Sequence, residues 1–402
     1  MLIKRDQAAS LRLHLRTFPV VLVAGPRQSG KTTLVRAELP SWKYVDLENP
    51  TDLDLLSSDP EGFLAANPRK LIIDEAQRYP QLFPLLRTVV DRRRRPGSFV
   101  LTGSAAPPLM RQSGETLAGR IGVLEMVPFG CSELAARPRW LAQRWFWGGL
   151  PPLYALSDAQ RKTAWLEQYV SSFLERDIPA MGIHVAPVRL RKLWMMLAHV
   201  HGGLLNISDL ARSLDLSVPS IAHHLDILEG AFMIRRLQPY HANISKRLVK
   251  SPKLYIRDTG LLHHLAGLRQ PQDLETWPGR GNSWEGFVLE ELIRRAKSRW
   301  PAPSFYFWRT QAGAEADLII DGITKTMEGD FSFKNSVIIK NGGQLKVGPS
   351  GELVIRAKTM SVADSASQVN ANAVGGQPVS PVTLRVYSYC YSSYQCCNNV
   401  YQ

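Results

Sequence analysis

The residues best suited to chemistry lie in one short stretch, GPRQSGKT at residues 25–32, which directly follows an apolar run. The stretch fits the pattern G-x-x-x-x-G-K-[ST], in which glycines let the backbone bend until successive N–H groups face a phosphate. A helix would begin there with the positive end of its dipole beside that phosphate. Lys31 would reach the β- and γ-phosphates, and the Thr32 hydroxyl would bind magnesium. An ordinary glycine turn is the alternative.

This phosphate loop predicts that the protein binds ATP and ADP together with Mg²⁺. The residues expected to hold the nucleotide follow the pattern without a gap: Gly25, Pro26, Arg27, Gln28, Ser29, Gly30, Lys31, Thr32 and Thr33.

A second stretch, LIIDE at residues 71–75, is an apolar run that ends in two carboxylates. Asp74 would hold the magnesium ion together with Thr32, directly or through water. Glu75 would orient and deprotonate the attacking water, so it is the expected catalytic base beside Lys31. A pair of surface acids at the end of a strand is the alternative.

Two later stretches predict groups that sense the nucleotide. VLTGS at residues 100–104 is a strand ending in hydroxyls, and Ser104 would lie between Glu75 and the γ-phosphate. LAGR at residues 117–120 ends in Arg120, which would act as an arginine finger on its own nucleotide or on that of a neighbouring subunit. A capped turn and a solvated arginine are the respective alternatives.

The elements that must position these residues alternate between short β-branched runs and helical patterns. Such alternation predicts an α/β fold with a parallel sheet covered by helices on both faces. Helices are expected at residues 31–38 and 81–92. The expected strands are residues 19–24, 43–47, 70–74, 98–102 and 122–127.

The order of the phosphate loop, LIIDEAQ, LTGSA and LAGR…VPFG resembles the prokaryotic AAA+ ATPases of the AAA_14 type. Five later segments strengthen the resemblance, which covers residues 1–321: FWGGLP (146–151), YVSSFLERDI (169–178), KLYIRDTGL (253–261), GNSWEGFVLE (281–290) and FWRTQAGAEAD (307–317). The resemblance implies ATP binding, a P-loop sheet and Mg²⁺-dependent hydrolysis by a protein whose carboxy-terminal domain is uncharacterised.

On this basis we divide the chain into five segments. Residues 1–135 would form the AAA+ ATPase domain, 136–200 a helical lid and 201–265 a winged helix. The family resemblance makes residues 266–322 a truncated, restriction-endonuclease-like α+β remnant. Residues 323–402 differ in composition, with 11 charged residues of 80 against 73 of 322 before them. They form an unassigned β-prone tail, for which a natural module, a foreign fusion and a reading-frame accident are the alternatives.

The winged-helix prediction rests on residues 207–229. Ser208 would cap a first helix and Ser217 a second, with residues 233–237 and 254–256 as the wing. The second helix carries no Lys or Arg, so it is poorly suited to read bases. Any DNA contact would be non-specific and made by the basic residues around the wing: Arg235, Arg236, Lys246, Arg247, Lys250 and Lys253. A lid or oligomer contact is the alternative.

A nuclease site in the carboxy-terminal remnant would require an acid followed by a Glu-x-Lys motif. Glu290, Glu315 and Asp317 supply acids, but the best-placed lysine, Lys340, follows Ile338 where the carboxylate should stand. We therefore expect the remnant to be inactive.

Composition limits the class of protein. The net charge of +14 favours an anionic partner, and a homo-oligomer remains open. Four cysteines are too few for a disulfide scaffold, and Cys390, Cys396 and Cys397 lack a second zinc pair. We expect a cytoplasmic protein without a membrane segment or a signal peptide, and no solenoid because no repeat of fixed period is visible.

Overall fold

The computed structural model describes residues 3–92, 94–104, 117–135, 139–180, 183, 185–240, 250–299, 303–309 and 315–321, and the backbone of short strands between 324 and 387. The chain divides into two compact units. The first unit comprises residues 1–235 and 254–294, and the second comprises residues 236–253 and 295–402. This division differs from the five segments proposed from the sequence, which stay a prediction.

The first unit begins with a five-stranded parallel sheet in the order β2-β3-β4-β1-β5. Every residue of the two strands that carry the loop and the acids, β1 and β3, is buried, as expected for a parallel sheet covered on both faces. The α/β class predicted from the sequence is confirmed. The strands are β1 (Val20–Gly25), β2 (Lys43–Asp46), β3 (Leu71–Asp74), β4 (Phe99–Ser104) and β5 (Ile121–Glu125).

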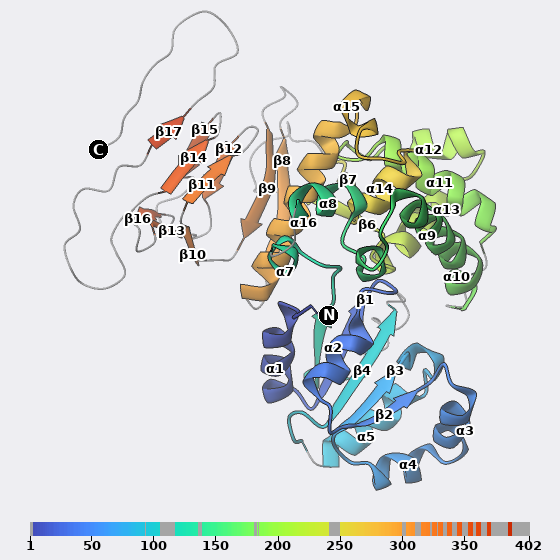
Figure 1. Cartoon of the computed structure of the whole chain (residues 1–402). Helices are drawn as coiled ribbons and strands as arrows, with labels where there is room; N and C mark the ends of the chain where they lie inside the picture. Colours follow the sequence, from blue (N-terminus) through green and yellow to red (C-terminus); the bar gives the residue numbers. More distant parts are fainter. Residues whose placement is uncertain are drawn as a thin grey trace, which may run out of the picture. The chain divides into compact units, whose positions relative to one another are not determined.

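Helices cover both faces of this sheet (Figure 1). On one face, Val21 and Val23 of β1 share a hydrophobic cluster with α1 (Gln7–Thr17) and α2 (Lys31–Glu38). On the other face, Val20 and Leu22 share a cluster with α3 (Pro50–Ser58), α4 (Pro60–Ala66) and α5 (Leu82–Arg92). The alternation of side chains along β1 therefore builds two cores from one strand.

After β5 the first unit is mainly helical and shares one large core around the fully buried Trp194. None of the helices that the structure describes is long and apolar enough to cross a membrane. The helices are α7 (Cys131–Leu134), α8 (Trp140–Trp147), η2 (Pro151–Tyr154), α9 (Ala159–Ser172), the π-helical turn η3 (Phe173–Asp177), α10 (Ile178–Ala180), α11 (Pro187–His199), α12 (Ile207–Leu214), α13 (Val218–Gly230), α14 (Thr259–Leu265), α15 (Asp273–Thr276) and α16 (Arg280–Arg299).

Helices α12 and α13 occupy the predicted helix-turn-helix segment and are followed by β6 (Ile234–Pro239) and β7 (Lys253–Ile256). Ser217 caps α13 by accepting a hydrogen bond from the Ser220 amide. The predicted cap of the first helix is wrong. Asn206 caps α12, because its side chain accepts the amides of Ser208 and Asp209, and Ser208 lies inside the first turn.

Two segments of the family resemblance meet where α14 approaches the end of α8. The Gly149 amide donates to the carboxylate of Asp258 at 2.8 Å, and Asp258 also caps α14. At Gly260 a Cβ atom would lie 2.1 Å from the backbone oxygen of Trp147. Only a glycine at position 260 lets the two backbones come this close.

The second unit contains β8 (Ser304–Arg309) and β9 (Glu315–Asp321), which pair antiparallel. Within this unit β8 also pairs in parallel with the end of β6, at Gln238 and Pro239. Within this unit, Tyr240, Ala316 and Ile319 form a small core.

The β-prone tail forms short parallel ladders in which the strands β10 to β14 each pair with the strand three places later. This pairing is that of a β-solenoid, so the expectation that the chain has none is wrong. The interval between the starts of paired strands varies from 20 residues for β10 and β13 to 32 for β14 and β17, so no fixed period marks them in the sequence. They are β10 (Thr324–Met327), β11 (Gly329–Ser332), β12 (Ser336–Ile339), β13 (Gln344–Val347), β14 (Leu353–Arg356), β15 (Thr359–Val362), β16 (Gln368–Asn370) and β17 (Arg385–Tyr387). The three tail cysteines lie outside the described residues.

The close approach at Gly260 predicts a specific loss of stability. Gly260→Ala should lower the free energy of unfolding by about 2 kcal/mol, because the new methyl group overlaps the Trp147 carbonyl. Gly281→Ala is the matched control, since a Cβ on that α16 glycine would meet nothing within 4 Å. Urea unfolding of both variants measures the difference. Equal stability of the two variants would contradict the close approach.

Candidate nucleotide site

The carboxyl ends of β1, β3 and β4 lie at one edge of the parallel sheet (Figure 1). In this register Gly25 is level with Ser104, and Ile73, just before Asp74, is level with Leu101. The residues that follow these strands are therefore brought together although they are far apart in the sequence.

The phosphate loop joins β1 to α2 through two residues in the left-handed backbone conformation, which few residue types adopt readily. Gly30 is the N-cap of α2 and has φ of 94°, and Gln28 also lies in the left-handed region at 58°. The side chain of Lys31 is turned back onto the loop, where its Nζ donates to the carbonyls of Gly25 and Pro26 at 3.1 Å each. Lys31 is only 5% exposed. Burial lowers the pKa of Lys31, while the charges of Glu75 and Asp74 act in the opposite direction.

Asp74 is the most densely hydrogen-bonded acid of the site. Its Oδ2 accepts the hydroxyls of Thr32 at 2.7 Å and Tyr44 at 2.6 Å, and its Oδ1 accepts Thr102. Burial raises the pKa of Asp74, although the hydrogen bonds from Tyr44 and Thr32 oppose that rise. Thr32 was predicted from the sequence as a neighbour of Asp74, whereas Tyr44 and Thr102 were not. They reach Asp74 because β2 and β4 flank β3, a lateral order of strands that no motif in the sequence marks.

Glu75 directly follows β3 with φ of 53°. Its Oε2 accepts the hydroxyl of Ser104 at 3.0 Å and also accepts the side-chain amide of Gln77. The structure therefore brings together Glu75 and Ser104, as it does Thr32 and Asp74. It places Thr33, on the first turn of α2, at the exposed mouth of the loop.

Arg120 lies at the other end of the sheet. The backbone carbonyl of Arg120 accepts the amide of Val20, the first residue of β1, whereas the phosphate loop follows the last. Its guanidinium binds both carboxylate oxygens of Asp91, at 2.6 and 3.0 Å. The prediction that Arg120 acts on its own nucleotide is therefore wrong, because the length of β1 separates them. A role on a neighbouring subunit stays a prediction.

The loop is also contacted by residues from outside the strands of the sheet. The buried guanidinium of Arg5 donates to the Ser29 carbonyl at 2.8 Å. From α9, the Tyr169 hydroxyl donates to the Arg27 carbonyl at 3.3 Å, and at the end of η3 the Asp177 carboxylate pairs with the Arg27 guanidinium. No motif in the sequence predicted these contacts.

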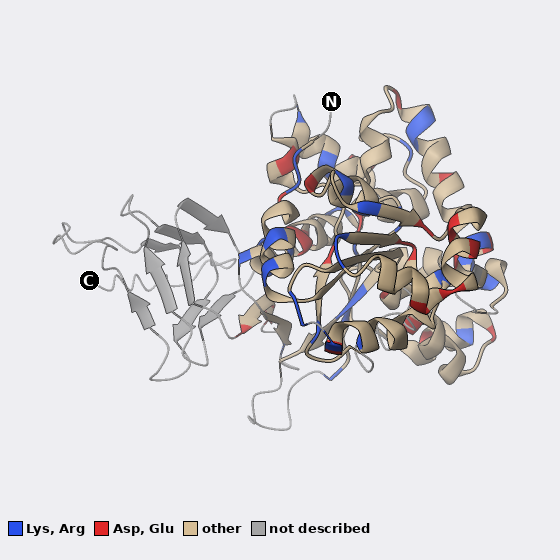
Figure 2. Ribbon diagram, turned by 90° about the horizontal axis from the view of Figure 1, so that it is seen from below, with Lys and Arg blue, Asp and Glu red and all other residues tan. Residues whose placement is uncertain are grey.

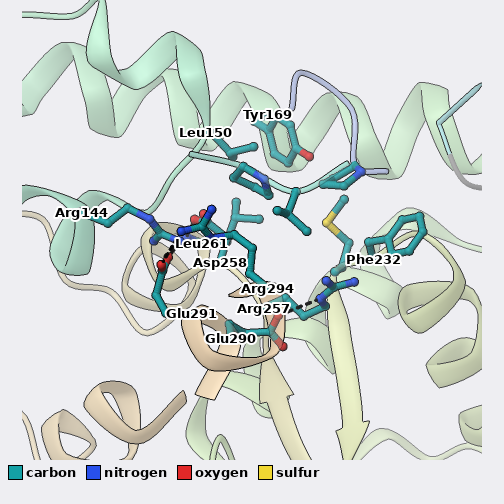
Figure 3. Close-up of a pocket in the computed structure, with 14 residues that line it drawn as sticks. Arg144, Leu150, Tyr169, Phe232, Arg257, Asp258, Leu261, Glu290, Glu291 and Arg294 are labelled. Atoms are coloured by element: carbon teal, nitrogen blue, oxygen red, sulfur yellow. Dashed lines mark hydrogen bonds and ion pairs between the residues drawn. The ribbon is translucent and has the colours of Figure 1, made fainter. Parts of the chain in front are cut away.

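Beside Pro26 lies a small cavity of about 30 Å³ whose walls come from the loop and from the helical part of the first unit. Figure 3 shows Tyr169 pointing toward this cavity and two groups of paired charges across from it. Glu290 joins Arg257 at 3.3 Å, and Glu291 joins Arg144 at 3.3 Å. Arg257 also pairs with Glu125 at the end of β5, so the buried charges link the sheet to α16. This volume suits water rather than a ligand.

The side chains at the loop fit a magnesium ion and a phosphate. Carboxylate and hydroxyl oxygens are the ligands that Mg²⁺ prefers, and Asp74 and Thr32 present both at 2.7 Å from each other. The buried hydroxyl of Ser29 has no hydrogen-bond partner among the described residues. In the part of the chain that the structure describes, the hydrogen-bond acceptors of Lys31 are two neutral carbonyls. An anion would therefore supply partners that this donor set lacks.

A larger pocket of about 610 Å³ opens beside the same loop, within the size range of small-molecule sites. It runs along α2 from the loop toward the N-terminal segment. Its lining residues are Ile3, Lys4, Arg5, Gly30, Thr33, Leu34, Ala37, Glu38, Phe129, Pro151, Tyr154 and Ala155.

Some of the basic residues predicted to contact DNA are paired with acids inside the protein. Arg235 pairs with Glu290 at 2.5 Å, and Lys253, which is 3% exposed, pairs with Glu315 and Asp317. The prediction that Arg235 and Lys253 contact DNA is therefore wrong, because their charges are neutralised inside the protein. Lys246 and Arg247 lie outside the described residues, and Arg236 is half-buried. Lys250 is exposed. In the view of Figure 2, basic and acidic segments are interspersed along the ribbon.

The same ion pairs bear on the predicted nuclease remnant. In the second unit the Lys253 ammonium lies between two of its proposed acids, 3.2 Å from Asp317. The third acid, Glu290, is paired with arginines. Lys340 lies outside the described residues, and the absence of activity stays a prediction.

The hydrogen bond from Tyr44 to Asp74 predicts a pH effect on magnesium binding. Tyr44→Phe removes a donor that lowers the pKa of this carboxyl, so that pKa should rise further. A proton then displaces Mg²⁺ at higher pH, and the midpoint of Mg²⁺-dependent ADP binding should move up by about one pH unit. Titrations at a series of pH values test this, with Tyr79→Phe as control. A midpoint that does not move, or moves down, would contradict it.

Family models match three consecutive parts of the chain. A model described as an AAA domain (AAA_14) matches residues 17–135, and two domains of unknown function, DUF8612 and DUF4143, match residues 138–272 and 280–328. Among solved structures, the chain is similar to the Walker-type ATPase PABY2304 of Pyrococcus abyssi. That similarity has a TM-score of 0.46 and 15% identity, and it covers 66% of this chain and 96% of that protein.

Uncharacterised proteins of Mycobacterium tuberculosis and Mycobacterium bovis are each 44% identical over 322 residues, 79% of this chain and 71% of each relative. An uncharacterised protein of Haemophilus influenzae is 27% identical over 218 residues, 50% of this chain and 52% of that protein. The mycobacterial relatives and the AAA match together show that the chain belongs to the AAA_14 family, AAA+ ATPases with a carboxy-terminal domain of unknown function.

Proposed function

We propose that the protein binds ATP with Mg²⁺ and hydrolyses it slowly, coupling the state of the nucleotide to its helical, winged-helix half. One observation carries the proposal. At the carboxyl edge of a single sheet the structure groups a buried lysine, a hydroxyl–carboxylate pair and a second carboxylate beside a hydroxyl. Phosphoryl transfer needs this set of groups and little covalent chemistry from the protein.

Each residue would have a separate task. Lys31 would exchange its neutral carbonyl acceptors for phosphate oxygens, since a charged acceptor binds an ammonium more strongly. Thr32 and Asp74 would hold Mg²⁺, which when bound neutralises charge on the phosphates. Glu75 would accept a proton from the attacking water, and Ser104, which donates to Glu75, would hold that carboxylate in place and respond to the terminal phosphate.

The pocket of 610 Å³ would take the nucleoside end of the ligand. It includes Gly30 and Thr33 of the phosphate loop, so a molecule in it reaches the loop without a gap. Tyr154, which is partly exposed and packs edge-to-face against the buried Phe129, contributes an aromatic ring on which a base would stack.

A nucleotide-gated switch with little turnover is the second candidate. It is favoured by the contacts of Tyr169 and Asp177 with Arg27, because through them the helical half binds the phosphate loop directly. Such a switch would act on a protein partner, on DNA through the exposed Lys250, or on a second copy of the chain.

Turnover distinguishes the two candidates. Glu75→Gln should lower steady-state phosphate release by about 100-fold while leaving ATP affinity unchanged, because only the base is lost. Lys31→Ala should lower ATP affinity itself. Glu48→Gln, an exposed carboxylate on the same domain, is the control. If wild type and Glu75→Gln release phosphate equally slowly, hydrolysis is not the function and the switch is favoured.

The nucleoside pocket predicts a selective loss. Ala37→Trp should weaken ATP binding by about tenfold, because the indole fills space along α2, but should leave the affinity for inorganic tripolyphosphate unchanged. Ala65→Trp places the same side chain on an exposed position of α4 as control. Calorimetric titration measures both ligands. Unchanged ATP affinity, or equal loss for both ligands, would contradict this placement of the nucleoside.

A further inference from the structure

An acid from the helical half lies among the charged groups of the phosphate site. Asp177 is the last residue of the π-helical turn η3, and its carboxylate pairs with the guanidinium of Arg27 in the phosphate loop. The side chains of Arg27 and Asp177 are 28% and 13% exposed, so the pair is largely shielded from water. π-Helical turns of this kind are frequent at functional sites.

Besides Arg27, Asp177 interacts electrostatically with two other charged groups of the site, Lys31 and Glu75. Its negative charge acts to raise the pKa of Lys31, and the charge of Glu75 acts to raise the pKa of Asp177. The pKa of Asp177 is raised mainly by burial, and this effect outweighs the opposing charge of Arg27. The surroundings of Asp177 therefore disfavour the ionised form of its carboxylate.

We propose that Asp177 occupies Arg27 in place of the nucleotide phosphates and is displaced when they bind. Both a carboxylate and a phosphate accept hydrogen bonds from a guanidinium, so they compete for Arg27. They also repel each other, and this repulsion is weakly screened at a partly buried site. Asp177 thus sets the affinity of the loop for nucleotide, and its release frees η3 to move. This inference rests on the proposed function and names the regulation of the same site.

The opposite role for Asp177 makes the opposite prediction. If the carboxylate instead positions Arg27 for the phosphates, removing its charge would leave Arg27 poorly oriented and weaken binding. The sign of the change in affinity therefore decides between the two roles.

Asp177→Asn removes the charge and keeps the shape of the side chain. Binding of ATPγS and of ADP, each with Mg²⁺, is measured by calorimetry. ATPγS should bind about tenfold more tightly to the variant than to wild type, with a smaller gain for ADP, which carries less negative charge. Glu175→Gln, an exposed carboxylate on the same π-helical turn, should bind like wild type. Equal or weaker binding of ATPγS by Asp177→Asn would overturn the proposal.

A double-mutant cycle tests whether Arg27 is the residue in dispute. Arg27→Ala should weaken ATPγS binding, and Asp177→Asn should bring a smaller gain in that background because there is no guanidinium left to free. A full gain in the Arg27→Ala background would show that Asp177 acts elsewhere and overturn the displacement. Asp177→Ser, checked by circular dichroism, serves as a second variant if Asp177→Asn unfolds.

Failure of this inference is distinguishable from failure of the proposed function. If wild type binds ATPγS and Asp177→Asn binds no more tightly, only the displacement is overturned. If wild type, Asp177→Asn and Glu175→Gln are all folded and none binds ATPγS or ADP with Mg²⁺, the nucleotide-binding function is overturned, and the inference with it.

Discussion

A buried ammonium group governs the chemistry at the end of the sheet. Lys31 is drawn into the protein as the first residue of α2, and desolvation disfavours its charge. The nearby negative charges belong to Asp74 and Glu75, which the parallel register places at the ends of the neighbouring strands, yet its hydrogen bonds go to two backbone carbonyls. Burying a charge costs free energy unless the charge is paired, so an anion that replaced these neutral acceptors would stabilise the ammonium. The loop, the two acids and the hydroxyls are all placed with respect to this cation.

The sequence was sufficient for the parts of the fold that depend on local pattern. Buried β-branched runs predicted all strands of the first sheet to within two residues, and the glycines and lysine of the loop predicted the start of α2. It also paired Thr32 with Asp74, as the two groups expected to hold magnesium, and Glu75 with Ser104, as neighbours at the γ-phosphate. Such inferences succeed because the carboxyl ends of all strands in a parallel sheet lie at the same edge, so residues that follow different strands come close together.

The lateral order of the strands in the sheet, and contacts between residues far apart in the chain, could not be predicted from the sequence. Tyr44 and Thr102 bind Asp74 because β2 and β4 flank β3, which the order of strands along the chain does not reveal. The place of Arg120, by contrast, follows from its position just before β5, because a residue ahead of a parallel strand lies at the amino edge of a sheet whose chemistry is at the carboxyl edge. Asp177 and Arg27 are 150 residues apart in the chain, and only the packing of α9 and η3 against the loop unites them. That packing extends the candidate nucleotide site into residues 138–272, which match a domain of unknown function.

Thermal unfolding with and without MgATPγS tests the central claim most directly, because a ligand that binds only the folded state raises the midpoint by mass action. The account predicts that MgATPγS raises the midpoint of the wild-type protein, that chelating Mg²⁺ with EDTA removes most of the rise, and that Lys31→Ala shows none. No rise in the wild-type protein, or an equal rise in Lys31→Ala, would contradict the claim that this lysine and its loop bind a nucleotide.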